Sequence, residues 1–325
     1  MKGTVDTAGG HPRVSVVIPC FNAEAFIADT LDSVLASDPA PGGSLEVIVA
    51  DDSSTDATLQ VLAPYRDRVK VIENRANSGS PSRPRNQGIR ESSGEFIAFC
   101  DHDDLWLADK LRKQLPLFHN ERVGLVCTDA LAFDERGVTL PSIGALRPLK
   151  RGWRHKDLLL ENFIVSSTAL VRRSALEQVG GFDESIFPGE DIDLWLRIAT
   201  EWEIDRVPEV LVRYRSSRTQ FSHNKALMHE ARMRVVERHA RARYPGREAR
   251  RIIARNWKQI GSGLHWQRND KEARAMFWRA LRADPLDPAC WLLLSSTLLP
   301  GKLTDSLVRA RRRLRGSGRA CDPPA

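Results

Sequence analysis

The stretch Leu45-Glu46-Val47-Ile48-Val49-Ala50-Asp51-Asp52-Ser53-Ser54-Thr55-Asp56 decides the fold. It opens with a mostly apolar, β-branched run, which favours a buried strand. Acidic and hydroxyl residues follow at once, and these residue types commonly begin helices. Residues 57–62 continue with helical spacing, so a strand is expected to run directly into a helix.

The same strand–helix unit recurs on both sides of this stretch. Further strands are expected at 14–19, 69–72, 95–100 and 123–128, and helices at 23–36, 85–91 and 107–118. Repeated units of this kind predict an α/β fold with a mostly parallel sheet flanked by helices on both faces. Ligands of such sheets bind beyond the carboxyl ends of the strands.

Three polar clusters follow predicted strand ends. They are Asp51-Asp52, the loop 77–86, and Asp101-His102-Asp103-Asp104. Each cluster taken alone is also explained by a turn or by capping of the next helix. Their position on one rim favours a ligand site, while turn and capping roles stay open for the individual residues.

Asp101 and Asp103 are spaced to act together. In an extended chain, residues i and i+2 point to the same side. Two hard oxygen donors suit Mg²⁺ or Mn²⁺, which bind carboxylates together with phosphate oxygens and water. A divalent cation held there could bridge a diphosphate. His102 is expected to point away from it.

Composition excludes several classes of protein. The 325 residues are 42% hydrophobic, which excludes wholesale disorder, and no run of eighteen apolar residues predicts a membrane-spanning helix. Residues 1–12 resemble a loose tail rather than a secretory signal. Five scattered cysteines argue against a disulfide framework or a zinc site, and a cytoplasmic location fits them: Cys20, Cys100, Cys127, Cys290 and Cys321.

Charge is distributed unevenly along the chain. From residue 225 onward there are 23 Lys and Arg against 9 Asp and Glu, whereas the preceding part has 26 against 33. Opposite balances suggest two parts with different roles. The basic part is compatible with nucleic acid, with an anionic membrane surface, or with a solvated Arg-rich helical face.

Five strings, in this order, resemble one known family, the family 2 glycosyltransferases with the GT-A fold. They are Ser15-Val-Val-Ile-Pro-Cys-Phe-Asn22, Val47-Ile-Val-Ala-Asp-Asp-Ser-Ser-Thr-Asp56, Arg83-Pro-Arg-Asn-Gln-Gly-Ile89, Gly94-Glu-Phe-Ile-Ala-Phe-Cys-Asp-His-Asp-Asp-Leu-Trp106, and Gly180-Gly-Phe-Asp-Glu184 with Gly189-Glu-Asp-Ile-Asp-Leu-Trp-Leu-Arg197. The resemblance covers residues 13–215, about two thirds of the chain.

This resemblance implies a binding site for a nucleotide-diphosphate sugar. Pro19 and Phe21 would line the base pocket, and Asp51 and Asp52 would bind the base or ribose. Arg85 would approach the base or the diphosphate. Asp101 would contact ribose or metal-bound water, and Asp103 would bind Mn²⁺ or Mg²⁺ directly. For Asp104, a role in this site and a role in capping the next helix both stay open.

The resemblance also implies an acid pair for catalysis. Asp191 would be the general base, and Glu190 beside it would add like charge and raise the pKa of one of the two. A base opposite a leaving diphosphate predicts a single displacement that inverts the anomeric centre. Trp195 and Arg197 are expected to pack and to form an ion pair rather than to contact substrate.

Two departures from the family pattern stand out. Tyr214-Arg215 is followed by serines, where many relatives have a histidine that joins the metal or diphosphate site. His223 further along could substitute for it, or lie on the surface. Pro84 replaces a small residue before Arg85-Asn86 and is expected to stiffen the loop there.

The C-terminal part is predicted to be all-α. Trp257, Gly261, Ala273, Phe277, Ala280 and Pro285 follow the spacing of a tetratricopeptide repeat, and Trp291 comes 34 residues after Trp257. Fewer than two repeats cannot form a free solenoid. We therefore expect packing on the catalytic domain or a partner chain, with a groove for a partner peptide as the alternative.

The predicted organisation has four parts: a tail at 1–12, a GT-A domain at 13–222, a helical tetratricopeptide-like region at 223–303, and a basic tail at 304–325. The tail contains a basic run at 309–315, which could rest on anionic lipid as a peripheral contact on the inner face of the membrane, or simply be solvated. Nucleic acid is not expected as a partner, because no aromatic residues are interleaved with this run.

The sequence as a whole predicts a cytoplasmic, metal-assisted, inverting glycosyltransferase. Its donor would be a UDP- or dTDP-linked sugar, and its acceptor a hydroxyl of a glycan or a lipid-linked molecule in bacterial surface polysaccharide synthesis. A nicotinamide-dependent oxidoreductase would need a Gly-x-Gly-x-x-Gly turn where Pro19-Cys-Phe-Asn22 stands. A non-enzymatic module that binds nucleotide sugars or recruits partners through the C-terminal helices stays as the alternative.

Overall fold

The computed structural model divides into two compact units, Met1–Val235 and Val236–Ala325. It describes residues 13–37, 43–134, 137, 139, 155–160, 162–216 and 224–298. The first unit contains the predicted α/β domain, and the boundary between the units falls inside a long helix, α9 (Lys225–Arg243).

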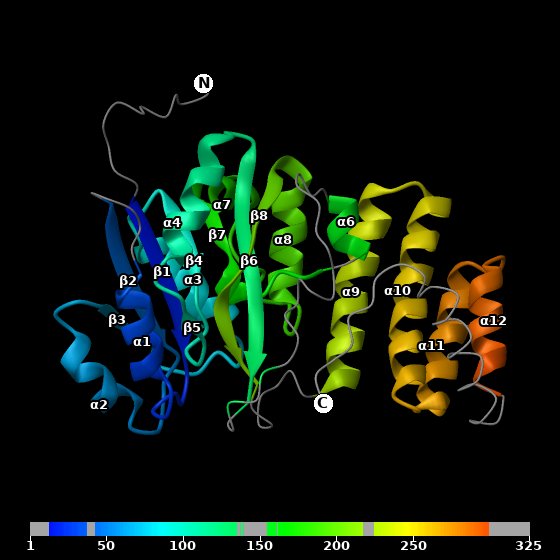
Figure 1. Cartoon of the computed structure of the whole chain (residues 1–325), viewed down its shortest axis with the longest axis horizontal. Helices are drawn as coiled ribbons and strands as arrows, with labels where there is room; N and C mark the ends of the chain where they lie inside the picture. The colour runs from blue at the N-terminus through cyan, green and yellow to red at the C-terminus, as the bar shows by residue number, and fades with distance from the viewer. Residues whose placement is uncertain are drawn as a thin grey trace. The chain divides into compact units, whose positions relative to one another are not determined.

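The first unit is built on an eight-stranded sheet (Figure 1). Its strand order is β3-β2-β1-β4-β7-β6-β8-β5. The strands are β1 (Arg13–Cys20), β2 (Ser44–Asp51), β3 (Lys70–Glu73), β4 (Phe96–Phe99), β5 (Leu105–Trp106), β6 (Val123–Phe133), β7 (Leu170–Arg172) and β8 (Glu203–Arg215).

Most of these strands run in one direction, as predicted. β1 pairs in parallel with β2 and β4, β2 with β3, and β6 with β8. β7 is antiparallel to both β4 and β6, and β5 is antiparallel to β8. The carboxyl ends of β1, β2, β3, β4, β6 and β8 therefore share one rim of a mixed but mostly parallel sheet.

Helices cover both faces of the sheet. On β1, the even-numbered Val14, Val16 and Ile18 belong to one core cluster with residues of α1 (Ile27–Leu35) and α2 (Thr58–Leu62). The odd-numbered Val17 faces the other way and packs on Gly88 of α3 (Ser82–Glu91), where a Cβ atom would come within 2.3 Å of a Val17 methyl. Gly88 thus lets α3 lie close against the sheet.

The remaining helical segments connect these layers. They are η1 (Ala63–Tyr65), α4 (Lys110–Gln114), η2 (Leu115–His119), α6 (His155–Leu160), η3 (Ser166–Thr168), α7 (Arg173–Val179) and α8 (Glu190–Glu201). The predicted helix at 107–118 is thus split, and the second part is a 3₁₀ turn with Pro116 near its start. The loop expected around Pro84 is wrong, because Pro84 lies in the first turn of α3, where its missing N–H costs no hydrogen bond.

The second unit is helical, as predicted. Its helices after α9 are α10 (Gly246–Trp266), α11 (Asp270–Ala283) and α12 (Pro288–Ser296). α10 and α11 approach closely at Gly261, where a Cβ atom would meet a ring carbon of Phe277 at 2.8 Å. Helices are therefore present where the repeat pattern was found, but their membership of the tetratricopeptide family stays a prediction.

Among the described residues, no helix is both long and apolar enough to span a bilayer. Cys20, Cys100, Cys127 and Cys290 are buried and free. Cys321, the N-terminal tail 1–12 and the basic tail 304–325 lie outside the described residues.

Candidate active site

The sheet register brings the predicted clusters to one rim. Cys20 of β1 is level with Asp51 of β2, which is level with Glu73 of β3. Val17 pairs with Phe99, the last residue of β4, so Asp101 lies two residues beyond the end of that strand. Asp51, Asp52 and Asp101 therefore emerge at the same edge of the sheet, as the strand–helix pattern predicts.

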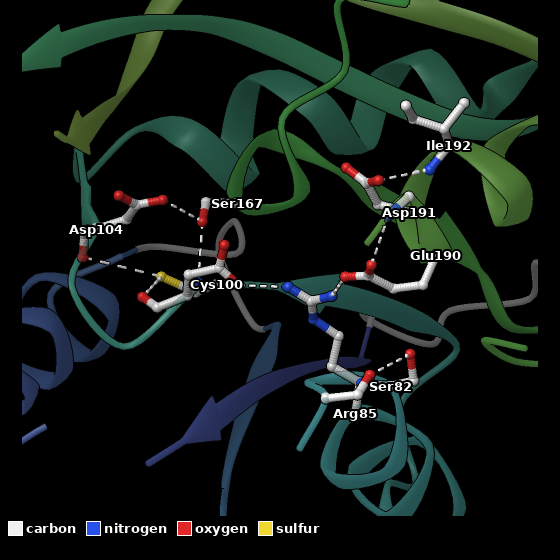
Figure 2. A network of polar contacts seen from close by, with 11 residues as sticks. Ser82, Arg85, Cys100, Asp104, Ser167, Glu190, Asp191 and Ile192 are labelled. Atoms are coloured by element: carbon white, nitrogen blue, oxygen red, sulfur yellow. Dashed lines mark hydrogen bonds and ion pairs between the residues drawn. The ribbon is translucent and has the colours of Figure 1, made fainter. Parts of the chain in front are cut away.

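Arg85 lies at the centre of this rim and joins three elements (Figure 2). Its Nη2 atom is 2.6 Å from Asp101 Oδ1, and its Nη1 atom is 2.9 Å from Glu190 Oε1. The guanidinium carbon lies 5.2 Å from the centre of the Phe182 ring. One side chain thus ties α3, the end of β4 and the first turn of α8 together, across 105 residues of sequence.

Arg85 is buried but strongly charged. Its side chain is 4% exposed, and burial alone would lower its pKa. The Asp101 and Glu190 carboxylates outweigh this effect and raise the pKa of Arg85 further above its usual range. Its Nε atom is buried and has no hydrogen-bond partner. A donor is therefore left over in a charged cluster, which is unusual in a purely structural ion pair.

Asp191 is the carboxylate of this cluster with a near-neutral pKa. Burial raises the pKa of Asp191 to about 7, with a further contribution from the negative charge of Glu190. The charge of Arg85 lowers the pKa of Asp191. A hydrogen bond from the backbone N–H of Ile192 to Asp191 Oδ1, at 2.7 Å, lowers it as well. A base with this pKa is well matched to proton transfer near neutral pH.

Glu190 has a different environment from its neighbour. Its Oε1 atom binds Arg85, and its Oε2 atom accepts a hydrogen bond from the backbone N–H of Gly189 at 3.1 Å. Both residues lie in the first turn of α8, where acidic side chains are favourable. The helix-terminus interpretation therefore holds for both, and both also lie close to the charge of Arg85.

The Asp101–Asp104 turn is held from two sides. Asp103 is almost fully buried, and its carbonyl oxygen accepts from Arg215 Nε at 3.0 Å. Asp104 is fully buried and accepts from Ser167 Oγ at 2.5 Å and from the backbone N–H of Arg215 at 2.9 Å. The capping alternative for Asp104 is wrong, because α4 begins only at Lys110.

Ser167 is a residue of this rim that the sequence did not indicate. Its hydroxyl accepts from the backbone N–H of Asp101 at 2.9 Å and donates to Asp104. It therefore connects the two ends of the acidic turn to η3. Nothing in the local sequence Val165-Ser-Ser-Thr-Ala169 distinguishes this serine from its neighbours.

The acidic turn fits a divalent cation that the substrate helps to hold. No group of three or more His, Cys, Asp or Glu side chains in the described residues is arranged to bind a metal ion by itself. Mg²⁺ and Mn²⁺ do not require one, because one or two carboxylates with phosphate oxygens and water are their common ligand set. Asp101 and Asp103 are the two carboxylates that would supply these oxygens. His223 lies outside the described residues.

Asp51 and Asp52 are both buried and already hydrogen-bonded. Asp51 accepts from the backbone N–H and the hydroxyl of Ser54, so the turn interpretation is confirmed for it. Asp52 accepts from Asn74 Nδ2 at 3.1 Å and from the N–H and hydroxyl of Ser78 at 2.8 and 2.7 Å. A carboxylate accepts about four hydrogen bonds, so Asp52 retains capacity for about one more.

The other predicted site residues differ in how far they are buried. Pro19 is buried at the end of β1, whereas the neighbouring Phe21 is 41% exposed. Trp195 is fully buried against Phe99 and Phe182, and Arg197 forms an ion pair with Asp193 at 2.7 Å. Packing and an ion pair, as expected, thus describe these two side chains of α8.

The Gly180–Glu184 string contacts α3 directly. Asn86 donates from Nδ2 to the Phe182 carbonyl and to Glu184 Oε1, both at 2.9 Å, and accepts from the Phe182 N–H at 2.8 Å. A Cβ atom on Gly181 would come within 2.4 Å of Asn86 Oδ1, so any larger residue there would have to displace the Asn86 side chain. Two strings that look independent in the sequence form one contact.

The sequence profile described as "Glycosyl transferase family 2" matches residues 15–180, which is more than half of the chain. The chain belongs to glycosyl transferase family 2. A second profile, "Glycosyltransferase like family 2", matches residues 146–282 and so extends into the helical unit.

Two curated relatives of this family 2 chain are named as glycosyltransferases. Poly(ribitol-phosphate) beta-N-acetylglucosaminyltransferase TarS of Staphylococcus aureus is 43% identical over 94 residues, 28% of this chain and 16% of TarS. The putative teichuronic acid biosynthesis glycosyltransferase TuaG of Bacillus subtilis is 32% identical over 221 residues, 66% of this chain and 83% of TuaG. The chain thus matches about a sixth of TarS but most of TuaG.

Solved structures share the fold. Residues 1–349 of S. aureus TarS, in complex with UDP-GlcNAc, superimpose with a TM-score of 0.63 at 21% identity, over 84% of this chain and 83% of that one. The mannosyltransferase PcManGT from Pyrobaculum calidifontis, in complex with GDP-Man and Mn²⁺, gives a TM-score of 0.56 at 20% identity, over 91% and 84% of the two chains. At these identities the likeness confirms the fold.

Proposed function

We propose that the chain transfers a sugar from a nucleotide-diphosphate sugar to an acceptor hydroxyl, with inversion at the anomeric carbon. The observation that carries this proposal is the Arg85 cluster. It joins the acidic turn after β4 to the acid pair at the start of α8, and this supports a proposed diphosphate site beside a carboxylate whose pKa is near neutral.

Asp101, Asp103 and Arg85 form the donor side of the site. Asp101 and Asp103 would hold Mn²⁺ or Mg²⁺, which when bound offsets the negative charge that grows on the departing diphosphate. Arg85 keeps Asp101 in place and contributes a permanent positive charge with one unused donor. Asp52, which holds the loop around Ser78 and retains acceptor capacity, would bind the base or ribose.

Asp191 is the group that acts on the acceptor. An alcohol is a poor nucleophile until a base accepts its proton. We assign this proton to a carboxylate oxygen of Asp191, and we assign Glu190 the role of orienting the pair, because both of its oxygens are already bound. One base opposite one leaving group corresponds to a single displacement and therefore to inversion.

The names of the relatives suggest the class of acceptor. TarS is named for a poly(ribitol-phosphate) acceptor, and TuaG for teichuronic acid biosynthesis. We extend this to a hydroxyl of a glycan or lipid-linked acceptor in bacterial cell-surface polysaccharide synthesis. A UDP- or dTDP-linked donor is the corresponding proposal for the nucleotide, and contact of the basic C-terminus with the inner membrane surface is the proposal for location.

A thermal-shift screen of nucleotide sugars, with and without Mn²⁺, tests the proposed donor. One nucleotide class is expected to raise the melting temperature, and more so with the metal. Asp103→Ala should remove the metal-dependent part of the shift, whereas Asp109→Ala, in the partly exposed ion pair with Lys113, should leave it intact. A donor shift that is the same with and without metal would contradict the proposed role of Asp103.

A further inference from the structure

Exposed apolar side chains are concentrated in the helical unit. Of the eight large hydrophobic residues recorded as exposed in the described chain, six lie within residues 266–298. Their exposure runs from 44% at Trp291 to 84% at Leu286. These six are Trp266, Trp278, Leu286, Trp291, Leu292 and Leu298. A concentration of this kind marks an interaction surface more often than a random distribution does.

Five of these six residues lie on α11, on α12 or in the short segments next to them. The rings of Trp278 and Trp291 meet edge to face, with their centres 5.7 Å apart. Trp291 Nε1 donates to the Pro285 carbonyl at 2.9 Å, which holds this ring against the turn that carries Leu286. Along α12, Trp291 and Leu292 are consecutive exposed residues, and the exposed Leu298 follows two residues beyond the end of the helix. We call these five residues the α11–α12 face.

Basic residues border the α11–α12 face. On α11, Lys271 and Arg282 are exposed and lie seven residues before and four residues after Trp278, on the same side of the helix. Between residues 236 and 298 there are 13 Lys and Arg against 6 Asp and Glu. The surface therefore combines tryptophan, leucine and positive charge.

We propose that the α11–α12 face binds the surface of an anionic lipid bilayer. Tryptophan favours the interface between headgroups and acyl chains, leucine favours the acyl chains, and Lys and Arg are attracted to anionic headgroups. A second copy of the chain would bring positive charge against positive charge. A nucleic acid would stack on the tryptophans but would leave Leu286, Leu292 and Leu298 without apolar partners.

This surface differs from the basic tail that the sequence suggests as a membrane contact. It lies within the described residues and supplies apolar as well as charged groups. It is also independent of the proposed transfer reaction, because none of its residues belongs to the Arg85 cluster.

Vesicle flotation with the full chain tests this proposal. Binding is expected to vesicles of phosphatidylcholine with phosphatidylglycerol, and not to phosphatidylcholine alone. Leu292→Ser should weaken the vesicle affinity roughly fivefold, because an inserted apolar group is lost. Arg282→Glu should weaken it roughly tenfold at low salt, because attraction to the headgroups becomes repulsion.

Matched controls lie in the first unit. Leu107→Ser removes another exposed leucine, and Arg68→Glu reverses another exposed arginine. Both should bind vesicles like the unchanged chain. Thermal unfolding of all four variants verifies folding, and release of nucleotide from the donor should be the same in all of them, so that failure here is distinguishable from failure of the proposed function.

Three results would overturn the proposal. The first is vesicle binding that Leu292→Ser and Leu107→Ser weaken equally. The second is binding that Arg282→Glu abolishes while Leu292→Ser leaves it unchanged, since this would be charge attraction without insertion. The third is light scattering that finds a dimer in the unchanged chain and a monomer in Leu292→Ser, since the face would then bind a second copy.

Discussion

The charge on Asp191 is the residue-scale quantity that controls the proposed chemistry. Burial and the neighbouring Glu190 raise its pKa to about 7, whereas Arg85 limits the rise. An acceptor proton can move only to the ionised form. The pH dependence of the transfer rate should therefore reflect the pKa of this single carboxylate.

The pH dependence of transfer follows from this pKa. Because the base must be ionised, kcat/KM should fall about tenfold per pH unit below about pH 7 and level off above it. The measurement is donor turnover between about pH 5 and 9 in buffers of constant ionic strength. A rate that is flat through neutral pH would mean that no group with this pKa acts as the base.

Arg85 is the residue whose loss should cost the most stability in the cluster. Arg85→Ala leaves Asp101 and Glu190 without their buried partner, which typically costs about 3–5 kcal/mol. Arg66→Ala breaks the ion pair with Glu73, in which both side chains are about half exposed, and should cost about 0–1 kcal/mol. Denaturant unfolding compares the two, and similar losses would show that the Arg85 bridge is not a strong interaction.

At the scale of elements, Ser167 links η3 to the acidic turn through hydrogen bonds to Asp101 and Asp104. Ser167→Ala removes the acceptor for the Asp101 N–H and a donor to Asp104. We expect a higher Mn²⁺ requirement and a KM for the donor that rises more than kcat falls. Ser166→Ala, next to it and also buried, is the control. Equal metal requirements in the two variants would show that Ser167 does not position the turn.

The packing of α10 on α11 gives a second test at this scale. Gly261→Ala would place a methyl 2.8 Å from Phe277, and overpacking of this kind costs about 1–3 kcal/mol. Gly263→Ala has open space around it and should stabilise α10 by about 1 kcal/mol. Thermal unfolding should therefore move in opposite directions for the two. Two shifts of the same sign would contradict this packing.

At the scale of the whole molecule, the sequence predicts that acidic residues gather at one edge of the sheet. It does not predict which side chains pair with one another there. Val47-Ile48-Val49 and Phe96–Phe99 are apolar runs followed by acids, and repeated strand–helix units bring such ends together. The pairing of Arg85 with Glu190 spans 105 residues, and nothing local identifies which acid a guanidinium will bind. The three-residue β7 and the two-residue β5 are too short to produce a periodic signal.

In the second unit, too, the sequence predicts the packing of helices but not which side chains are exposed. The spacing around Gly261 and Phe277 predicts a close helix pair, and the structure has one. The exposure of Trp278 and Trp291 was not predicted. An apolar residue at helical spacing is expected to be buried, and only the three-dimensional structure shows whether another element covers it.

The central claim is that one carboxylate activates the acceptor while others hold the donor. Asp191→Asn tests it most directly, with Glu201→Gln at the exposed end of α8 as the control. With the donor selected by thermal shift, Asp191→Asn should show the same donor-induced shift as the unchanged chain, while release of the nucleoside diphosphate falls about 10²- to 10⁴-fold. A release rate equal to that of Glu201→Gln would contradict the claim.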